Sequence, residues 1–168
     1  MFHLGILTIS DKGWQGERQD KSGDVIKERL SLADGHLVKY EIVPDEISMI
    51  ADKLAGWSDE GSVDVILTTG GTGLSRRDVT PEATLSVVDR VVPGFGEAMR
   101  VQTFSSTPMA MLSRAVAGVR GGCLIINLPG SPKAVRECLE VILPAIPHAV
   151  EIIKGEVTEH AASEAGKD

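Results

Sequence analysis

The chain has 168 residues, of which 42% are apolar and 24% charged, a composition typical of one soluble globular domain. Its 24 acidic and 17 basic residues give a formal net charge of -7, which argues against nucleic acid as a partner, because such binding gathers Lys and Arg against phosphates. The two cysteines, Cys123 and Cys138, form no Cys-x-x-Cys pair and predict neither a disulfide scaffold nor a zinc site.

Apolar runs rich in β-branched residues predict four strands, each followed by a turn or a helix-cap signal. Residues 1–10 lack the basic segment and cleavage site of a signal peptide, and their apolar run is too short to span a bilayer. We therefore expect a cytoplasmic protein that does not enter a membrane. The predicted strands are 4–9, 37–43, 63–68 and 123–127.

Between these runs the apolar period becomes helical, which predicts helices that alternate with the strands. Pro144 and Pro147 should kink or break the last helix. After Lys154 the sequence is too polar to bury, so residues 155–168 are expected to form a flexible tail. The helices are expected after a possible cap at Ser22, after Asp45, at 81–89 and 96–103, and from Pro132 behind a Ser131 cap.

This alternation predicts an α/β fold, with a mainly parallel sheet covered by helices on both faces, in a single domain over residues 1–154. In open sheets of this kind, ligands bind at the carboxyl ends of the strands. Four segments are expected there and should share one cleft: 10–11, 44–45, 70–78 and 127–132.

A glycine-rich loop after the third predicted strand is the strongest functional signal in the chain. Gly70, Gly71 and Gly73 let a ligand approach backbone N–H groups, and Asp78 follows within reach. Thr80 is a good helix cap, and the start of the helix behind it favours anions. The pattern predicts a site for a phosphorylated ligand, with carboxylates available for Mg²⁺.

The individual side chains leave structural alternatives open. Asp78 could instead cap a helix or pair with Arg76 or Arg77, and Asp45 could simply cap the helix that follows it. Arg114 could hold an anion or merely tie down a loop.

Two other features concern the type of chemistry. Residues 15–20 form a solvated loop or one that closes over a ligand. The four histidines are isolated from any nucleophile motif, which disfavours hydrolysis through a covalent intermediate. No P-loop motif is present, and Arg76 stands where a dinucleotide fold would have its third glycine.

The combination of motifs resembles the molybdopterin adenylyltransferases, the family of the bacterial Mog protein, its MoaB-type relatives and the G domains of plant Cnx and animal gephyrin. The resemblance covers nearly all of the chain except the tail. It is carried by segments 6–11, 20–23, 43–46, 69–73, 77–83, 93–96, 112–118 and 127–131.

The resemblance implies a three-layer α/β/α sandwich, assembled as a homotrimer, that transfers AMP from Mg-ATP to the terminal phosphate of molybdopterin and releases pyrophosphate. Two aspartates that are essential in this family match Asp45 and Asp78, which are therefore expected to be catalytic, and our hypothesis is that they hold Mg²⁺ on the triphosphate. Segment 91–107 is compatible with an interface helix or with a core role. The substrate-binding residues expected from the resemblance and the strand-end segments are Ser10, Asp11, Ser22, Gly70, Gly71, Thr72, Gly73, Thr80, Glu82, Ser113, Arg114, Asn127, Pro129, Gly130 and Ser131.

Two other functions remain open from the sequence. One is a MoaB-like, non-catalytic pterin-binding or assembly protein, although Pro44-Asp45 and segment 77–82 favour the Mog-like catalytic branch. The other is a nucleotide pyrophosphatase like that of competence-induced proteins, whose chains normally carry a further domain. The molybdenum insertion protein is a candidate partner that would accept the product.

Overall fold

Six strands form one sheet in the order β2-β1-β3-β6-β5-β4 in a computed structural model, which describes residues 1–31 and 33–156. β1 pairs in parallel with β2 and β3, and β3 pairs in parallel with β6. β5 is antiparallel to both β6 and β4, so the sheet is mainly parallel, as expected. The strands are β1 (Phe2–Ile9), β2 (Gly35–Val43), β3 (Val65–Thr69), β4 (Arg90–Val91), β5 (Ala117–Arg120) and β6 (Cys123–Leu128).

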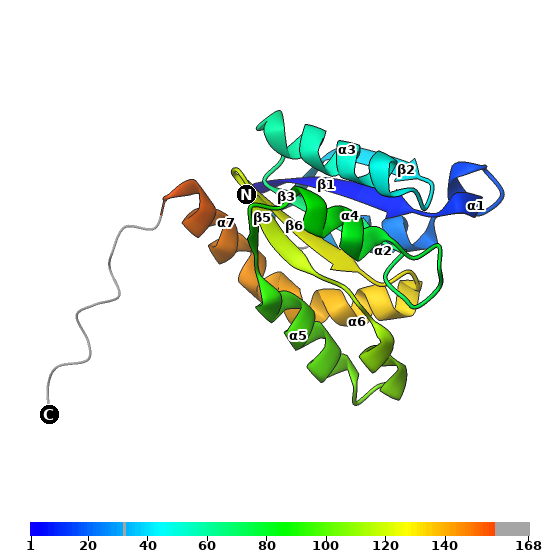
Figure 1. Cartoon of the computed structure of the whole chain (residues 1–168). Helices are drawn as coiled ribbons and strands as arrows, with labels where there is room; N and C mark the ends of the chain where they lie inside the picture. Colours follow the sequence, from blue (N-terminus) through cyan, green and yellow to red (C-terminus); the bar gives the residue numbers. More distant parts are fainter. Residues whose placement is uncertain (32, 157–168) are drawn as a thin grey trace, which may run out of the picture.

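Helices cover both faces of this sheet, which gives the three layers seen in Figure 1. α3 and α4 lie on one face, while α2, α5, α6 and α7 lie on the other. The helices are α1 (Asp11–Trp14), α2 (Lys21–Ser31), α3 (Ile47–Asp59), α4 (Thr80–Val87), α5 (Pro93–Thr103), α6 (Pro132–Ile142) and α7 (Ile146–Lys154), with 3-10 turns η1 (Pro108–Leu112) and η2 (Leu143–Ala145).

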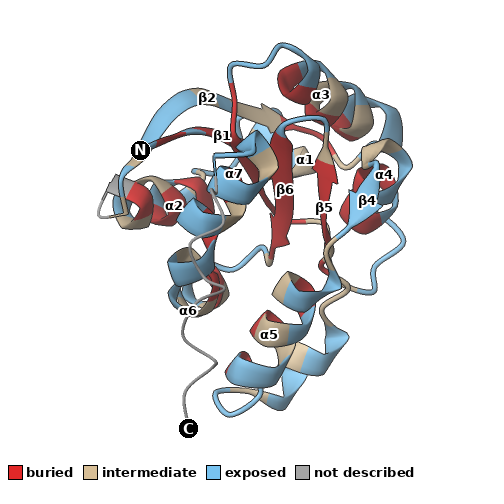
Figure 2. Ribbon diagram, turned by 90° about the vertical axis from the view of Figure 1, so that its left-hand side faces the viewer, coloured by how far each residue is buried: buried red, intermediate tan, exposed pale blue. Residues whose placement is uncertain are grey.

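The central strands are buried on both faces, because their side chains alternate between two separate cores. In β3, Val65 and Leu67 point into the core under α2, α5 and α6, whereas Ile66 points into the core under α3 and α4. In β6, Ile126 and Ile125 divide between the same two cores. Figure 2 shows β5 and β6 buried between helices whose outer faces are exposed. The three-layer α/β fold is therefore confirmed.

The four predicted strands and the five predicted helices are present, with small shifts at their ends. Pro144 lies in η2 and Pro147 in the first turn of α7, so the prolines do end α6 and restart the chain as a new helix. The expected tail lies outside the described residues from residue 157 onward.

Two predicted caps are wrong. The residue before α4 is Val79, and Thr80 is already helical, because its hydroxyl donates to the Gly70 carbonyl instead of capping the helix. Ser22 lies inside α2, and the Asp20 carboxylate caps that helix by accepting from the Gly23 N–H at 2.9 Å. The Ser131 cap is confirmed, since its hydroxyl accepts from the Ala134 N–H.

The antiparallel strand β5 was not predicted, because segment 115–122 resembles a series of small turns. Gly118 makes this segment resemble a turn, although it lies within β5. A Cβ at Gly118 would approach Val88 Cγ1 to 2.7 Å and the Arg90 carbonyl oxygen to 2.8 Å, so the glycine permits close packing within the sheet rather than a turn. Among residues 1–31 and 33–156, none of the helices combines the length and the apolar character that a bilayer span requires.

Candidate active site

The carboxyl ends of the parallel strands open into a pocket of about 660 Å³. Residues from all four predicted strand-end segments line it, including Ser10, Asp45, Gly70 and Gly130. The expectation that these segments share one cleft is therefore confirmed, and it follows from the parallel pairing of β1, β2, β3 and β6.

The glycine loop turns sharply because two of its residues adopt positive φ angles, +96° at Gly70 and +67° at Gly71. The Gly70 N–H donates to the Leu128 carbonyl at 3.3 Å, which joins the loop to the end of β6. The loop carbonyls are also held, since Gly71 accepts from the Thr80 N–H at 3.0 Å. Within the described residues, the N–H groups of Gly71 and Gly73 donate to no protein acceptor, so these amides remain available to a ligand.

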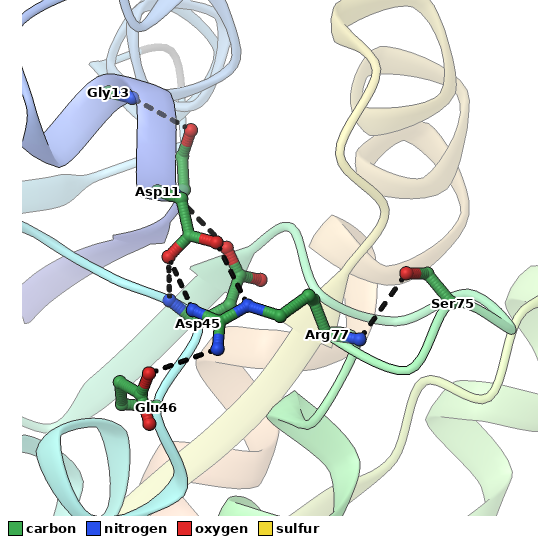
Figure 3. Close-up of polar contacts among 7 residues, drawn as sticks. Asp11, Gly13, Asp45, Glu46, Ser75 and Arg77 are labelled. Carbon is green, nitrogen blue, oxygen red and sulfur yellow. Dashed lines mark hydrogen bonds and ion pairs between the residues drawn. The ribbon is translucent and has the colours of Figure 1, made fainter.

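Asp45 and Asp11 hold each other through reciprocal hydrogen bonds between two strand ends (Figure 3). The Asp11 N–H donates to Asp45 Oδ2 at 3.0 Å, and the Asp45 N–H donates to Asp11 Oδ1 at 3.0 Å. Burial raises the pKa of Asp45, and the nearby carboxylates of Asp11 and Asp78 raise it further. The helix-cap alternative for Asp45 is not observed, because the cap position of α3 is Glu46.

Arg77 completes this cluster from the glycine-loop side (Figure 3). Its Nε and Nη2 donate to the two Asp11 oxygens at 3.1 and 2.8 Å, and its Nη1 donates to Glu46 Oε1 at 3.0 Å. The hydrogen bonds from Arg77 hold the pKa of Asp11 below its usual value. Asp78 accepts instead from the Ser75 N–H at 2.9 Å, so it does not form the pair with Arg77 that was considered from the sequence.

Arg114 ties down the glycine loop from behind. Its Nε donates to the Gly73 carbonyl at 2.8 Å, its Nη2 donates to the Asp78 carbonyl at 2.7 Å, and its guanidinium pairs with Glu82. Of the two roles considered for Arg114, the structure shows the tether.

Asn127 forms hydrogen bonds that hold secondary-structure elements together. It is fully buried, and its amide donates to the hydroxyls of Thr68 and Thr84 at 3.0 and 2.9 Å. Its position fixes β6 against β3 and α4, directly beneath the strand ends that form the pocket.

The predicted site residues therefore fall into three groups. Thr72, Gly73, Ser113 and Pro129 line a shallower neighbouring pocket of about 300 Å³, which shares Gly71, Asp78 and Gly130 with the main one. Five other predicted residues line neither pocket. Asp11, Thr80 and Arg114 form hydrogen bonds with residues that do line one. Glu82 pairs with Arg114, and Asn127 bonds to Thr68 and Thr84, so these two lie one step further from the pocket. The predicted residues that line the main pocket are Ser10, Ser22, Asp45, Gly70, Gly71, Asp78, Gly130 and Ser131.

Several residues of the main pocket were not predicted. Arg18 and Lys21 line it, and neither side chain has an ion pair within the described residues. Thr8 also lines it and donates to Asp20 Oδ2 at 2.6 Å. A hydroxyl near the end of an otherwise apolar strand is a signal that could have identified Thr8. Arg18 belongs to segment 15–20, for which closure over a ligand was one of the two alternatives, and residues 18–20 of that segment do line the pocket.

Comparison with known proteins agrees with this geometry. Residues 5–148 match the family described as "probable molybdopterin binding domain", and the chain belongs to this family. A molybdopterin adenylyltransferase of Helicobacter pylori (strain J99) is 48% identical over 155 residues, covering 91% of this chain and 88% of that protein. The molybdopterin adenylyltransferase of Escherichia coli K12 is 40% identical over 172 residues, covering 94% and 88%.

Among solved structures, the molybdopterin biosynthesis enzyme MoaB from Thermus thermophilus superposes with a TM-score of 0.88 at 55% identity, covering 92% of this chain and 98% of that one. The family resemblance is therefore confirmed. Relatives with adenylyltransferase and with MoaB names both span nearly the whole fold, so the choice between the two branches rests on the chemistry of the site.

Proposed function

We propose that this protein acts in molybdenum cofactor biosynthesis by transferring AMP from ATP to the terminal phosphate of molybdopterin, with release of pyrophosphate. The observation that carries the proposal is that Asp45 and Asp78 line the same pocket as the glycine loop, and that this pocket is large enough for a nucleotide. The high coverage of relatives named molybdopterin adenylyltransferase supports the same reaction.

The main electrostatic difficulty of this reaction is that both partners are anions. A phosphate monoester is largely ionised at neutral pH, so the attacking oxygen needs no general base. The new bond forms between that oxygen and the α-phosphorus of ATP, while the bond from the α-phosphorus to the leaving pyrophosphate breaks. The N–H groups of Gly71 and Gly73, which donate to no acceptor within the described residues, would stabilise the charge on the transferred phosphoryl group.

The donor set suits Mg²⁺. This ion is commonly bound by one or two carboxylates together with substrate phosphate oxygens, and Asp45 and Asp78 provide two carboxylates facing one pocket. Bound with ATP, the ion supplies positive charge that reduces repulsion between the two substrates. Asp45 and Asp78 would hold it, and the hydrogen bonds from the N–H groups of Asp11 and Ser75 orient their carboxylates.

The test is to incubate the purified protein with molybdopterin, Mg²⁺ and ATP, without molybdate, and to follow the products by mass spectrometry. Adenylylated pterin together with pyrophosphate is the expected result. Asp78→Asn should lower turnover at least about 100-fold while leaving the thermal unfolding midpoint within a few degrees, because Asp78 is half-exposed and its charge has no ion-pair partner within the described residues. Near wild-type turnover in Asp78→Asn would remove this residue from the mechanism.

The same assay separates the other two functions. Pterin that binds without conversion, in a preparation that a known active enzyme does convert, would indicate a MoaB-like binding or assembly protein. Free AMP without adenylylated pterin would indicate pyrophosphatase chemistry.

We propose that the chain assembles as a homotrimer through α5 and η1. Large apolar side chains are exposed along this part of the molecule, with Val101 70% and Met111 65% exposed. Light scattering of the purified protein should give three times the mass of the chain, and Val101→Glu should shift this value toward that of the monomer.

We also propose that the reaction takes place in the cytoplasm, with a molybdenum insertion protein as the acceptor of the product. The two cysteines are unpaired, and burial raises the pKa of both thiols to about 11, which suits reduced structural residues rather than disulfide partners.

A further inference from the structure

The carboxylates near the proposed metal site divide into two kinds. Asp11 and Glu46 already face a cation, because the guanidinium of Arg77 contacts both (Figure 3). Asp45 and Asp78 form no ion pair within the described residues, although they line the pocket. The division is not explained by the residue types, which are all acidic.

Arg77 contacts both oxygens of Asp11 and one oxygen of Glu46, so it compensates the charge of both carboxylates. Arg77 Nε and Nη2 donate to the two oxygens of Asp11 at 3.1 and 2.8 Å, and Asp11 Oδ1 also accepts a hydrogen bond from the Asp45 N–H. Arg77 Nη1 donates to Glu46 Oε1 at 3.0 Å. A bidentate guanidinium–carboxylate pair is directional, so it also sets where each carboxylate points.

Asp45 and Asp78 differ from Asp11 and Glu46 both in charge compensation and in what orients their carboxylates. Each is oriented by one backbone N–H, which comes from Asp11 for Asp45 Oδ2 and from Ser75 for Asp78 Oδ2. These bonds fix the side chains without neutralising them. A divalent cation with its bound nucleotide would supply the charge that they lack.

We propose that Arg77 is a fixed counter-ion that reserves Asp45 and Asp78 for the divalent cation and withholds Asp11 and Glu46 from it. Arg77 is then a positioning residue that takes the place of a second metal ion. Without it, the uncompensated charges of Asp11 and Glu46 would add to those of Asp45 and Asp78, which would attract a divalent cation more strongly and would no longer direct it to the latter two. This inference concerns how the site proposed above selects its metal, and it rests on the proposed function for the position of the cation between Asp45 and Asp78.

The test measures Mn²⁺ binding to the full chain without nucleotide or pterin, by the loss of the free Mn²⁺ paramagnetic resonance signal. Arg77→Gln should bind Mn²⁺ about 3- to 10-fold more tightly than wild type, the effect of removing one charge roughly 10 Å from a divalent cation at a water-like dielectric of about 80. Arg76→Gln is the matched control, since Arg76 is exposed, has no ion pair within the described residues and carries the same charge one position earlier. It should stay within about twofold of wild type.

Two further variants keep the proposal testable if Arg77→Gln folds poorly. Arg77→Lys keeps the charge without the bidentate contact and should bind Mn²⁺ within about twofold of wild type. Glu46→Gln should weaken binding by less than about threefold, whereas Asp78→Asn should weaken it at least about tenfold. Thermal unfolding of each variant reports whether it is folded.

A purely structural role for Arg77 predicts weaker metal binding on its removal, so tighter binding is the distinguishing result. Mn²⁺ binding by Arg77→Gln that is no tighter than that of Arg76→Gln would overturn the proposal. A loss of affinity in Glu46→Gln equal to that in Asp78→Asn would also overturn it, because Glu46 would then be a ligand. Failure of the wild-type protein to form adenylylated pterin would instead count against the proposed function and would leave these binding results unchanged.

Discussion

Replacing Gly70 by Ala should destabilise the protein strongly, because two independent constraints meet at this residue. Its φ of +96° lies outside the region that alanine adopts readily, at a cost of about 1–3 kcal/mol. A Cβ at this position would also lie roughly 1 Å inside van der Waals contact with the Ile9 carbonyl oxygen, at the end of β1. Together these effects should cost about 3–5 kcal/mol, a large part of the stability of an ordinary domain.

The backbone cannot move away easily to relieve this contact. The Gly70 carbonyl accepts from the Thr80 hydroxyl at 2.9 Å, and its N–H donates to Leu128 at 3.3 Å. We therefore expect the unfolding midpoint of Gly70→Ala to fall by about 10–15 °C for a chain of this size, measured by circular dichroism, with urea unfolding as the second measurement.

Gly130 provides the matched control for stability. It faces the same loop, has no positive φ, and a Cβ there would approach the Gly70 Cα only to 3.5 Å, an ordinary contact. Gly130→Ala should therefore cost less than about 1 kcal/mol. If the two variants differ by less than about 1 kcal/mol, the loop conformation is not the constraint inferred from the structure.

The remaining predictions concern charge in the pocket. Asp45→Asn should abolish turnover yet raise the free energy of unfolding, with a larger gain at pH 7 than at pH 3.5. The reason is that burial raises the pKa of Asp45 in the folded state, so its ionisation disfavours the folded state once the pH exceeds the pKa of the unfolded state. Thermal melts at both pH values test this, and a larger gain in unfolding free energy at pH 3.5 than at pH 7 would contradict it. Arg18→Ala and Lys21→Ala should each raise the KM for an anionic substrate about three- to tenfold, with a larger effect at low salt. Lys12→Ala removes an exposed cation outside the pocket and should leave the KM unchanged. Steady-state kinetics at two salt concentrations test this, and equal effects in all three variants would show that the pocket cations do not matter.

The position of the pocket could be predicted from the sequence because it depends on a topological rule and not on side-chain detail. Once strands and helices alternate, the residues that follow each parallel strand must meet at one edge of the sheet. Ser10, Asp45 and Gly70 were placed together on that basis, and all three line the pocket. The antiparallel strand β5 was not predicted, because a glycine required for packing resembles a glycine required for a turn.

Local pattern also could not separate residues that line the pocket from residues that support it. Asn127 and Arg114 belong to the motifs of the resemblance, yet Asn127 is buried within the sheet near the end of β6, and Arg114 bonds to the carbonyls of Gly73 and Asp78. The ion pair between Arg77 and Asp11 joins residues 66 positions apart in the sequence. Only the folded chain shows that Arg77 pairs with Asp11, whereas its sequence neighbour Asp78 accepts from the Ser75 N–H. Such choices depend on loop geometry at the scale of a single side chain.

The distribution of charge in the pocket explains how an acidic protein can bring two anionic substrates together. Asp45 and Asp78 would repel a bare triphosphate, so they favour ATP only in its metal-bound form. Arg18 and Lys21 line the same pocket, and within residues 1–31 and 33–156 neither cation has an ion-pair partner. We therefore expect the metal to be required for nucleotide binding but not for binding of the pterin phosphate. Chelation of divalent cations should abolish ATP binding in calorimetry and leave pterin binding within about twofold, since a cation that does not contact the pterin phosphate has little differential effect on its binding. Loss of both interactions together would show that the two anions share a single metal-dependent site, and it would contradict this division of the pocket.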